Sequence, residues 1–320
     1  MRRVARALTI AGSDSGGGAG IQADLKTFAA LGVYGMSAIT AITAQNTMSV
    51  EAVQPIDVEI VRKQIRAVVS DIGVDAVKTG MLYTREIIES VAEELEAVKA
   101  PIVVDPVMVA KSGAKLLKED AEEALIKKIL PLATVVTPNL PEAEHLAKMS
   151  IRCLEDSEEA ARKIATLGPK AVVVKGGHFE SEESIDILYY EGVVRRCVGK
   201  RVSGGTHGTG CTFASAIAAF LAREYDIYEA VDQAKHFVED AIKYSEKVGR
   251  GVAPVSPLGK TIFDAERMRV LESISEAVSL LEANPAFSKL IPECQTNLAM
   301  ALPEPTKLDD VAAIPGLSLI

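Results

Sequence analysis

The chain places a glycine-rich turn directly before an apolar segment: GGTHGTGC at residues 204–211, then TFASAIAAFL at residues 212–221. This pattern predicts a tight turn that opens into a buried helix. The first backbone N–H groups of a helix have no partner within it, and the helix dipole adds positive charge at the same end. The turn therefore predicts a site for an anion such as phosphate.

Cys211 is the first polar side chain of this predicted helix. A helix N-terminus stabilises a thiolate, so Cys211 is a candidate base that takes a proton from a bound alcohol. A cysteine at the start of an apolar helix is also often a small packed hydrophobic residue. His207, in the same turn, is interpreted as a turn or packing residue. An anion site beside a candidate base suggests phosphoryl transfer.

The composition indicates an ordinary soluble chain with a full-sized core, because 48% of its 320 residues are hydrophobic. The net charge of -9 argues against a broad surface for nucleic acid or for an anionic membrane. The four cysteines, without CxxC spacing, favour a reducing compartment, and we expect a cytoplasmic protein: Cys153, Cys197, Cys211 and Cys294. The apolar run after the basic start is too short for a signal peptide or a membrane span.

Segments typical of buried strands alternate with segments of helical periodicity. Strands are expected at 7–11, 34–44, 76–79, 101–104, 134–137 and 171–174, and helices at 21–31, 58–69, 85–98, 119–130, 158–167, 212–221 and 228–248. Residues 185–190 and 193–198 are expected to form a hairpin. The pattern predicts an α/β fold, a three-layer αβα sandwich whose mostly parallel central sheet has an antiparallel hairpin at its edge.

Polar residues follow several predicted strands, at the edge where open parallel sheets bind ligands: Asp14, Lys78, Asp105, Asn139 and Lys175. Asp105 and Glu142 could converge on Mg²⁺ beside substrate phosphates, and Lys175 could neutralise a phosphate. Structural alternatives exist for these residues. Glu142 suits the first turn of a helix that starts near Pro141, and Lys175 could extend along the surface.

A second glycine-rich loop, GGGAG at residues 16–20, precedes a predicted helix that carries Asp24. This loop has neither the Gly-Lys-Ser/Thr ending of a P-loop nor the spacing of a dinucleotide fingerprint. Asp24 could bind a ligand or complement the helix dipole. Gln45 and Asn46, at the end of the second strand, could hydrogen-bond a heterocycle or be turn residues.

A short polar segment, Lys111, Ser112 and Gly113, comes soon after Asp105. It could be a mobile lid over the reacting phosphate, and it could equally be a plain surface loop. The residues alone leave both interpretations open.

A break that contains glycine and proline, at residues 249–257, separates the main pattern from the rest of the chain. Residues 265–281 have a broad apolar helical face, and the proline-containing tail after them is too short to build a core of its own. We therefore expect one large domain over residues 1–259 and a helical tail over residues 260–320.

Several blocks of this chain, in one order, resemble the ribokinase-like fold and within it the hydroxymethylpyrimidine/phosphomethylpyrimidine kinases of thiamine biosynthesis. They are AGSDSGGGAGIQADLKT at 11–27, GML at 80–82, DPVM at 105–108, KSG at 111–113, TPNLPEA at 137–143, KGGH at 175–178 and THGTGC at 206–211. The resemblance covers about residues 8–259. It implies ATP-dependent phosphorylation of 4-amino-5-hydroxymethyl-2-methylpyrimidine, then of its monophosphate to the pyrophosphate, and it suggests a homodimer.

The same resemblance implies roles for individual residues. Asp24 and Gln45 would hold the aminopyrimidine, in a pocket lined by Gly12, Met81 and Val107. Asp105 and Glu142 would organise Mg²⁺, while Asn139 and Lys175 would serve the nucleotide phosphates. The residues of the anion hole would be Thr206, Gly208, Thr209, Gly210 and Cys211. Cys211 stands where ribokinase-like sugar kinases carry an aspartate base, so it is the expected catalytic residue.

Residues 268–316 are similar to the beginning of a thiamine-phosphate synthase domain, through LIPECQTNLAMALP at 290–303 and VAAIPG at 311–316. Such domains continue well beyond this length, so we expect no synthase activity and a tail that packs as a helix on the kinase or stays partly disordered. Two other functions stay open. One is a pyridoxal or pyridoxine kinase, which shares the fold and also phosphorylates a ring hydroxymethyl group; the other is a non-catalytic pyrimidine-binding sensor.

Overall fold

The structure is a computed structural model, and it describes residues 3–108, 117, 120–177, 183–284, 286, 296–303, 305 and 308–317. The three residues of the predicted lid, Lys111, Ser112 and Gly113, lie outside the described residues, as does His178 of the KGGH block. The lid therefore stays a prediction. The chain separates into two compact units, Met1–Leu258 and Gly259–Ile320.

The first unit is built on a nine-stranded sheet with the order β3-β2-β1-β4-β5-β6-β7-β8-β9. The strands are β1 (Arg6–Asp14), β2 (Tyr34–Gln45), β3 (Val50–Pro55), β4 (Ala76–Thr79), β5 (Ile102–Val104), β6 (Val135–Val136), β7 (Ala171–Val174), β8 (Glu183–Tyr190) and β9 (Val193–Lys200). Strands β2, β1, β4, β5, β6 and β7 run parallel, and β8 and β9 form the antiparallel hairpin at one edge. The predicted sheet is confirmed.

Strand β3 forms the other edge and pairs antiparallel with β2. The sequence pattern did not predict it. Its six residues, VEAVQP, are exposed or half-buried and end in a proline, so no buried apolar run marks the strand.

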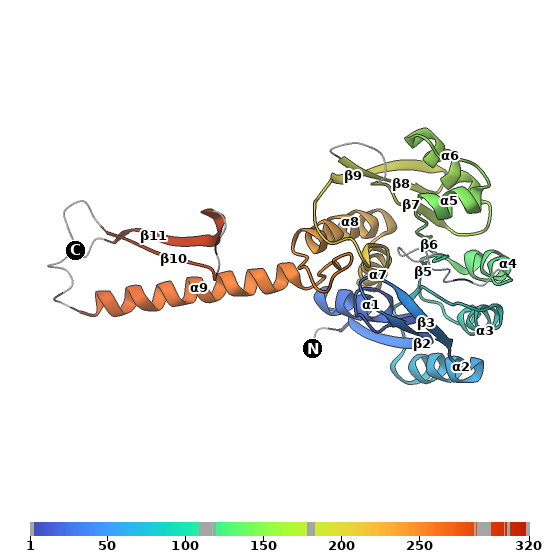
Figure 1. Cartoon of the computed structure of the whole chain (residues 1–320), viewed down its shortest axis with the longest axis horizontal. Coiled ribbons are helices and arrows are strands. Elements are labelled where there is room, and N and C mark those ends of the chain that lie inside the picture. Colours follow the sequence, from blue (N-terminus) through green and yellow to red (C-terminus); the bar gives the residue numbers. More distant parts are fainter. Residues whose placement is uncertain are drawn as a thin grey trace. The chain divides into compact units, whose positions relative to one another are not determined.

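Five of the parallel strands, β1, β4, β5, β6 and β7, are buried on both faces, which explains their continuous apolar sequences. Successive side chains point to opposite faces: Val172 and Val174 of β7 belong to one core, and Ala171 and Val173 belong to the other. Two groups of helices cover these faces and give the three layers (Figure 1). One group is α2 (Val58–Ala67), α3 (Arg85–Glu96), α5 (Leu140–Ala147) and α6 (Leu154–Ala165), and the other is α1 (Gly20–Ala30), α7 (Thr209–Ala222) and α8 (Ile227–Lys243).

Helix α7 is apolar on almost every side because it is enclosed by other elements. It contacts α1, α8 and strands β1, β4 and β5, and residues Thr212–Phe220 are all buried. The predicted helix at residues 119–130 is shorter in the described residues. It consists of α4 (Glu122–Ala124) continued by a π-helical turn at Leu125–Ile129.

The second unit combines α9 (Gly259–Glu282) with an antiparallel pair, β10 (Thr296–Ala301) and β11 (Val311–Leu317). A small apolar cluster of Val270, Ile274 and Leu302 joins the helix to this pair. The sequence predicted the helix but not the strands, since their short apolar runs lie among prolines that mask the pattern.

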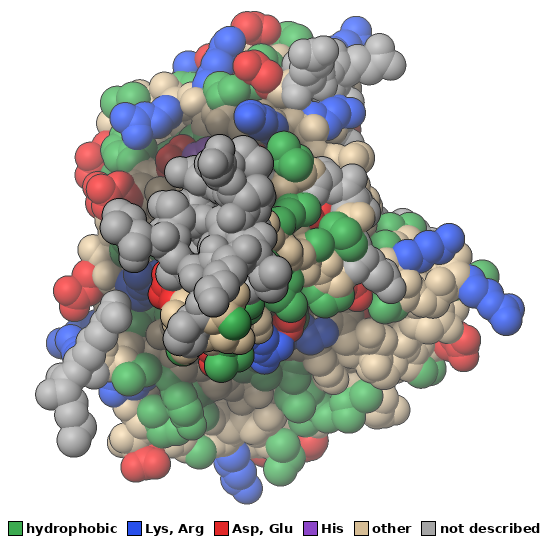
Figure 2. All heavy atoms as spheres, turned by 90° about the vertical axis from the view of Figure 1, so that its left-hand side faces the viewer, with side chains coloured by type: hydrophobic (Ala, Val, Ile, Leu, Met, Phe, Trp, Pro, Cys, Tyr) green, Lys and Arg blue, Asp and Glu red, His purple; other side chains and the backbone are tan. Residues whose placement is uncertain are grey.

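None of the helices that the structure describes has the length and apolarity needed to cross a membrane. On the face shown in Figure 2, acidic, basic and apolar side chains are interspersed.

Candidate active site

A cavity of about 600 Å³ opens where the parallel strands of the first unit end. Open α/β sheets bind ligands at this edge. Most of the predicted site residues line it: Gly12, Gln45, Met81, Asp105, Val107, Asn139, Glu142, Lys175, Thr206, Gly208, Thr209, Gly210 and Cys211. The sequence pattern thus located residues from several strand ends and from the glycine-rich turn in one place.

The glycine-rich turn presents the N-terminus of α7 to this cavity. Gly208, with φ of 82°, precedes the helix, and no side chain of the described residues caps it. The Thr209 hydroxyl donates to the Thr206 carbonyl oxygen at 2.8 Å, which closes the turn upon itself. The first N–H groups of α7 therefore have no partner within the helix, as an anion site requires.

Lys175 adds a positive charge beside this N-terminus. A Cβ atom placed on Gly210 would lie 3.3 Å from Lys175 Nζ and 3.7 Å from Asp105 Oδ2, so the glycine lets the ammonium approach the helix closely. Lys175 Nζ donates to Asp105 Oδ1 at 2.9 Å. Burial works to lower the pKa of Lys175, but the charges of Asp105 and Glu142 outweigh burial and raise it. The ammonium is therefore charged at neutral pH.

Glu142 is held in the first turn of α5 by a capping box. Asn139 N–H donates to Glu142 Oε2 at 2.8 Å, and Glu142 N–H donates to Asn139 Oδ1 at 2.9 Å. The cap thus takes up the oxygen of Asn139, which was predicted to serve phosphates. Burial raises the pKa of Glu142 to about 7; Lys175 opposes this rise and the negative charge of Asp105 adds to it.

Two buried carboxylates that repel one another are a suitable place for a divalent cation. Within the described residues no group of three or more metal-ligating side chains gathers, so the protein offers Asp105 and Glu142 as a partial set. Mg²⁺ fits such a set, because it is usually held by one or two carboxylates together with waters and substrate phosphates.

Cys211 lies half-buried at the cavity wall, but its thiol is not the low-pKa group that the sequence suggested. Burial raises the pKa of Cys211 to about 11, and Asp24 and Asp105 add to the rise. Lys78 and a hydrogen bond from the Gly20 backbone oppose it without outweighing it. The expected effect of the helix N-terminus is therefore overcome by lost hydration and nearby carboxylates.

Asp24 does not line the cavity, which corrects the expectation that it holds the aminopyrimidine. It is fully buried, and both oxygens are occupied within the protein. Lys78 Nζ donates to them at 2.8 and 3.0 Å, while Thr9 and Ser215 hydroxyls donate at 2.6 Å each. Asp24 instead holds Lys78, which borders the cavity. The residue Asp24 by itself could not reveal this, because its partners are distant in sequence.

Gly12, Met81 and Val107, which were predicted to line the pyrimidine pocket, all line this cavity. Met81 is 7% exposed, and a Cβ atom on Gly12 would lie 3.2 Å from its sulfur. Gly12 therefore leaves room for the methionine beside the cavity. Gln45 lines the same cavity from the end of β2.

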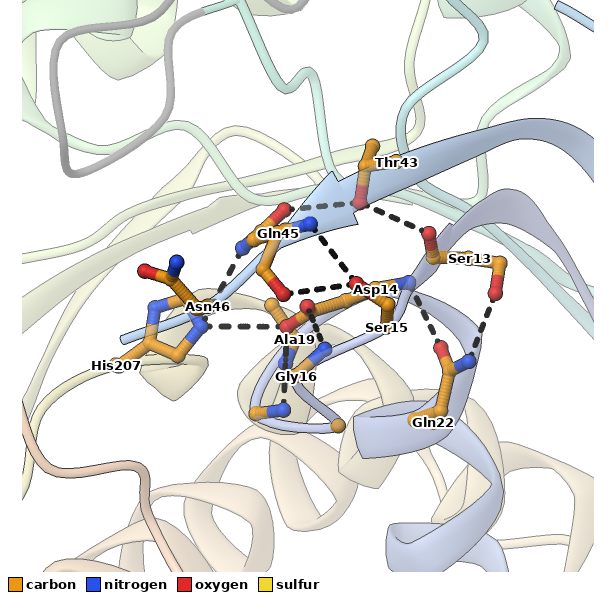
Figure 3. Close-up of polar contacts among 12 residues, drawn as sticks. Ser13, Asp14, Ser15, Gly16, Ala19, Gln22, Thr43, Gln45, Asn46 and His207 are labelled. Atoms are coloured by element: carbon orange, nitrogen blue, oxygen red, sulfur yellow. Dashed lines mark hydrogen bonds and ion pairs between the residues drawn. The ribbon is translucent and has the colours of Figure 1, made fainter. Parts of the chain in front are cut away.

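His207, which was interpreted from the sequence as a turn or packing residue, lines the cavity. Its Nε2 lies 3.3 Å from Asp14 Oδ2 and 3.5 Å from Gln45 Nε2 (Figure 3). His207 therefore links the glycine-rich turn to the ends of β1 and β2. Its place in the same motif as Cys211 was the one available signal, since no pattern within the sequence pairs it with Asp14.

Two family models match parts of the chain. Residues 14–256 match the family described as phosphomethylpyrimidine kinase, and residues 273–317 match the family described as thiamine-phosphate synthase ThiN. The hydroxymethylpyrimidine/phosphomethylpyrimidine kinases of Rhizobium meliloti and Bacillus subtilis are 52% and 45% identical, over 78% of this chain and 95% and 94% of those proteins. The thiamine biosynthesis bifunctional protein ThiED of Geobacter sulfurreducens is 50% identical over 251 residues, which are 78% of this chain and 51% of that protein.

Solved structures show the same fold at similar identity. The phosphomethylpyrimidine kinase of Clostridium difficile is 49% identical with a TM-score of 0.68, over 75% of this chain and 100% of that one. The pyridoxal kinase of Staphylococcus aureus, in complex with AMP-PCP and pyridoxal, is 42% identical with a TM-score of 0.74, over 81% of this chain and 95% of that one.

Proposed function

The chain belongs to the phosphomethylpyrimidine kinase family and is a kinase of thiamine biosynthesis. From this premise we propose its substrate and the roles of its residues. It transfers the γ-phosphoryl group of ATP to the hydroxymethyl oxygen of 4-amino-5-hydroxymethyl-2-methylpyrimidine, then phosphorylates the resulting monophosphate. The observation that carries the proposal is the α7 N-terminus facing a cavity beside Lys175 and Asp105.

Each group in the cavity suits one part of phosphoryl transfer, where catalysis is mostly positioning and charge stabilisation. The N–H groups of Gly210 and Cys211 and the Lys175 ammonium would bind the phosphate oxygens. Asp105 and Glu142 would hold Mg²⁺, which neutralises charge on the phosphates when bound.

The remaining parts of the proposed site bind the ring and cover the reacting groups. Gly12, Met81 and Gln45, which line the cavity, would hold the pyrimidine. Residues 111–113 stay a predicted lid, which would exclude water from the phosphate during transfer.

Cys211 stays the predicted base, although its thiol is protonated at neutral pH in the protein without ligands. A cation bound at Asp105 would remove one of the charges that raise the thiol pKa. The loose transition state of phosphoryl transfer also makes small demands on a base, since little new bond to the attacking oxygen has formed.

A second candidate function is phosphorylation of pyridoxal. It is favoured by the structural likeness to the pyridoxal kinase of Staphylococcus aureus, at 42% identity. Pyridoxal also carries a hydroxymethyl group on a heteroaromatic ring, so the same phosphate site would serve both reactions.

One assay separates these functions: release of ADP with the hydroxymethylpyrimidine, with its monophosphate and with pyridoxal, each at matched concentrations. We expect the enzyme to turn over both pyrimidines, and we expect kcat/KM to be higher for each of them than for pyridoxal. Turnover of pyridoxal alone would overturn the proposal in favour of the second function, and binding of pyrimidine without turnover would indicate a sensor.

We further propose a homodimer that works in the cytoplasm. The sheet edge at β3 and exposed apolar side chains near it, Ile42 at 49% and Met48 at 65% exposure, offer a surface for a second copy. Light scattering coupled to size-exclusion chromatography measures the mass, and a monomer at micromolar concentration would contradict the dimer.

A further inference from the structure

Among the predicted ring-binding residues that line the cavity, Gln45 is the one whose side chain can both donate and accept a hydrogen bond. Its backbone is fixed: Ser15 Oγ donates to Gln45 O at 2.8 Å, and Gln45 N–H donates to Ser15 Oγ at 2.8 Å. What stays variable is which end of the amide faces which neighbour. Figure 3 shows the amide between the Thr43 hydroxyl and the His207 ring.

Asp14 decides where His207 carries a proton. The Asp14 carboxylate is 3% exposed and accepts N–H groups from Gly16, Gly18 and Ala19 at 2.8 to 3.1 Å. Burial works to raise the pKa of Asp14, but hydrogen bonds from His207 and from the backbone hold it below its ordinary value. An ionised carboxylate only accepts hydrogen bonds, so His207 Nε2, 3.3 Å away, must carry hydrogen.

This proton creates a mismatch with Gln45. In the structure Gln45 Nε2 lies 3.5 Å from His207 Nε2, so two N–H groups face each other. Gln45 Oε1 meanwhile lies 3.2 Å from Thr43 Oγ1, and that hydroxyl also donates to Ser13 O at 3.0 Å. A hydroxyl has one hydrogen and two lone pairs, so once it donates to Ser13 it is better placed to accept than to donate.

A half-turn of the amide resolves both contacts at once. It brings the Gln45 carbonyl oxygen to the His207 N–H and the NH₂ group to Thr43 Oγ1, while the rest of the side chain stays in place. One hydrogen of the NH₂ group is then used by Thr43, and the second is available to the cavity that Gln45 lines.

We propose that His207 and Thr43 act as positioning residues that make Gln45 a hydrogen-bond donor toward the substrate ring. The inference rests on the proposed function and deepens it, because it states which edge of the substrate ring is recognised by the Gln45 amide. The kinase selects heteroaromatic rings that present an acceptor nitrogen there. A ring whose nitrogen carries hydrogen at that edge is rejected, because two donors would face each other and neither would have an acceptor.

The test uses two compounds that differ at this edge. The aminopyrimidine has a bare ring nitrogen beside its amino group, and its 4-oxo analogue has an N–H beside a carbonyl. For the wild-type protein we expect kcat/KM to favour the aminopyrimidine by about tenfold or more, the effect of one mismatched polar contact. His207→Phe keeps a ring against Gly18 and removes the N–H, so we expect this ratio to fall toward one, mainly through KM.

Further variants separate orientation from folding. Thr43→Val removes the acceptor for the NH₂ group and is expected to lower the same ratio. Gln45→Glu places a pure acceptor in the cavity and is expected to reverse the preference, a result that a packing role would not give. His236→Phe, which removes an exposed histidine of α8, is the matched control and should keep the wild-type ratio.

A wild-type ratio in His207→Phe, with the aminopyrimidine still turned over, would overturn the inference and leave the proposed function intact. If the wild-type protein turns over neither compound, the proposed function fails. The inference is then tested by calorimetric dissociation constants for the two compounds. A wild-type preference for the aminopyrimidine that His207→Phe abolishes supports the inference, and equal affinities of the wild-type protein for both compounds contradict it.

Discussion

Two features of the fold act on the pKa of the Cys211 thiol in opposite directions. The N-terminus of α7 lowers this pKa, whereas burial and the nearby carboxylates raise it. Burial and the carboxylates prevail, and the pKa is raised to about 11. If Cys211 nevertheless takes the proton from the substrate, its ionisation becomes easier as pH rises, so kcat should increase with pH above neutrality.

We therefore predict that Cys211→Ala lowers kcat by about 100-fold, the lower range of general-base effects, while KM changes little. The variant should also lose the rise of kcat with pH. Steady-state kinetics between about pH 6 and about pH 10 check both statements. Near-normal turnover with an unchanged pH profile would remove the base assignment.

Glu142 makes the stability of the kinase depend on pH. Its pKa in the folded protein is about 7, above the ordinary 4.5, so the folded state binds more protons than the unfolded state between these values. Stability must then fall as pH rises through this window. At higher pH the ionised carboxylate stays buried, which costs free energy unless a cation neutralises it.

We predict that Glu142→Gln raises the melting temperature of the ligand-free protein at about pH 8, by about 2 to 4 °C, and leaves it nearly unchanged at about pH 5. Mg²⁺ with a nucleotide should stabilise the wild-type protein at the higher pH and stabilise the variant less. Differential scanning fluorimetry measures all of these. A difference that is the same at both pH values would show that Glu142 does not change its protonation state between them, which would contradict the prediction.

Asp24 and His207 show what could be predicted from single residues and what could not. Both stand in recognisable motifs. Asp24 was expected in the cavity, but it is buried and paired with Lys78. His207 was expected to be a turn or packing residue, and it lines the cavity. The motif marks a region of the fold. Which way each side chain points depends on partners at distant positions, such as Lys78 for Asp24 and Asp14 for His207.

At the scale of elements, the glycine-rich turn depends on a close contact between backbones. A Cβ atom on Gly208, where φ is 82°, would overlap the carbonyl oxygen of Gly18. Gly192, in the turn between β8 and β9, has a similar φ of 80° and nothing within 4 Å of the same position.

These two glycines form a matched pair for a prediction. Gly192→Ala should cost about 1 kcal/mol, the strain of a left-handed alanine, and leave kinetics unchanged. Gly208→Ala should cost more and should raise KM for ATP by about tenfold or more, because the turn must move away from Gly18. Urea unfolding and kinetics of both variants provide the comparison. Equal effects would mean that backbone strain alone matters at both sites.

Elements with one strong periodicity were predicted well, and elements whose character comes from their neighbours were not. Strands β4 and β7 match the predicted ranges residue for residue, because they are buried on both faces and therefore continuously apolar. Strand β3 is polar and lies at an edge, and β10 and β11 are short and near prolines, so their pairing, and not their composition, makes them strands.

At the scale of the whole chain, the two units match two different families, and all the described residues that line the cavity belong to the first unit. That unit contains both large cores of the sheet. We predict that a protein of residues 1–258 folds and phosphorylates the pyrimidine with kcat and KM within about twofold of the full chain, a difference of less than about 0.5 kcal/mol. A large loss of activity in a folded truncation would assign residues 259–320 a part in the reaction.

The contact between Gly18 and Gly208 also has a thermodynamic consequence. The loop of Gly18 and the turn of Gly208 both border the cavity, and their backbones are in close contact, so we expect a shift of one to displace the other. Binding of the two substrates should then be cooperative, and the factor by which a nucleotide analogue tightens the pyrimidine must equal the factor by which the pyrimidine tightens the analogue. Titrations in either order measure this factor, and a value of one would show that the loops move independently. With a factor well above one, the kinase would respond to the product of the two concentrations, and scarcity of either compound would empty both sites.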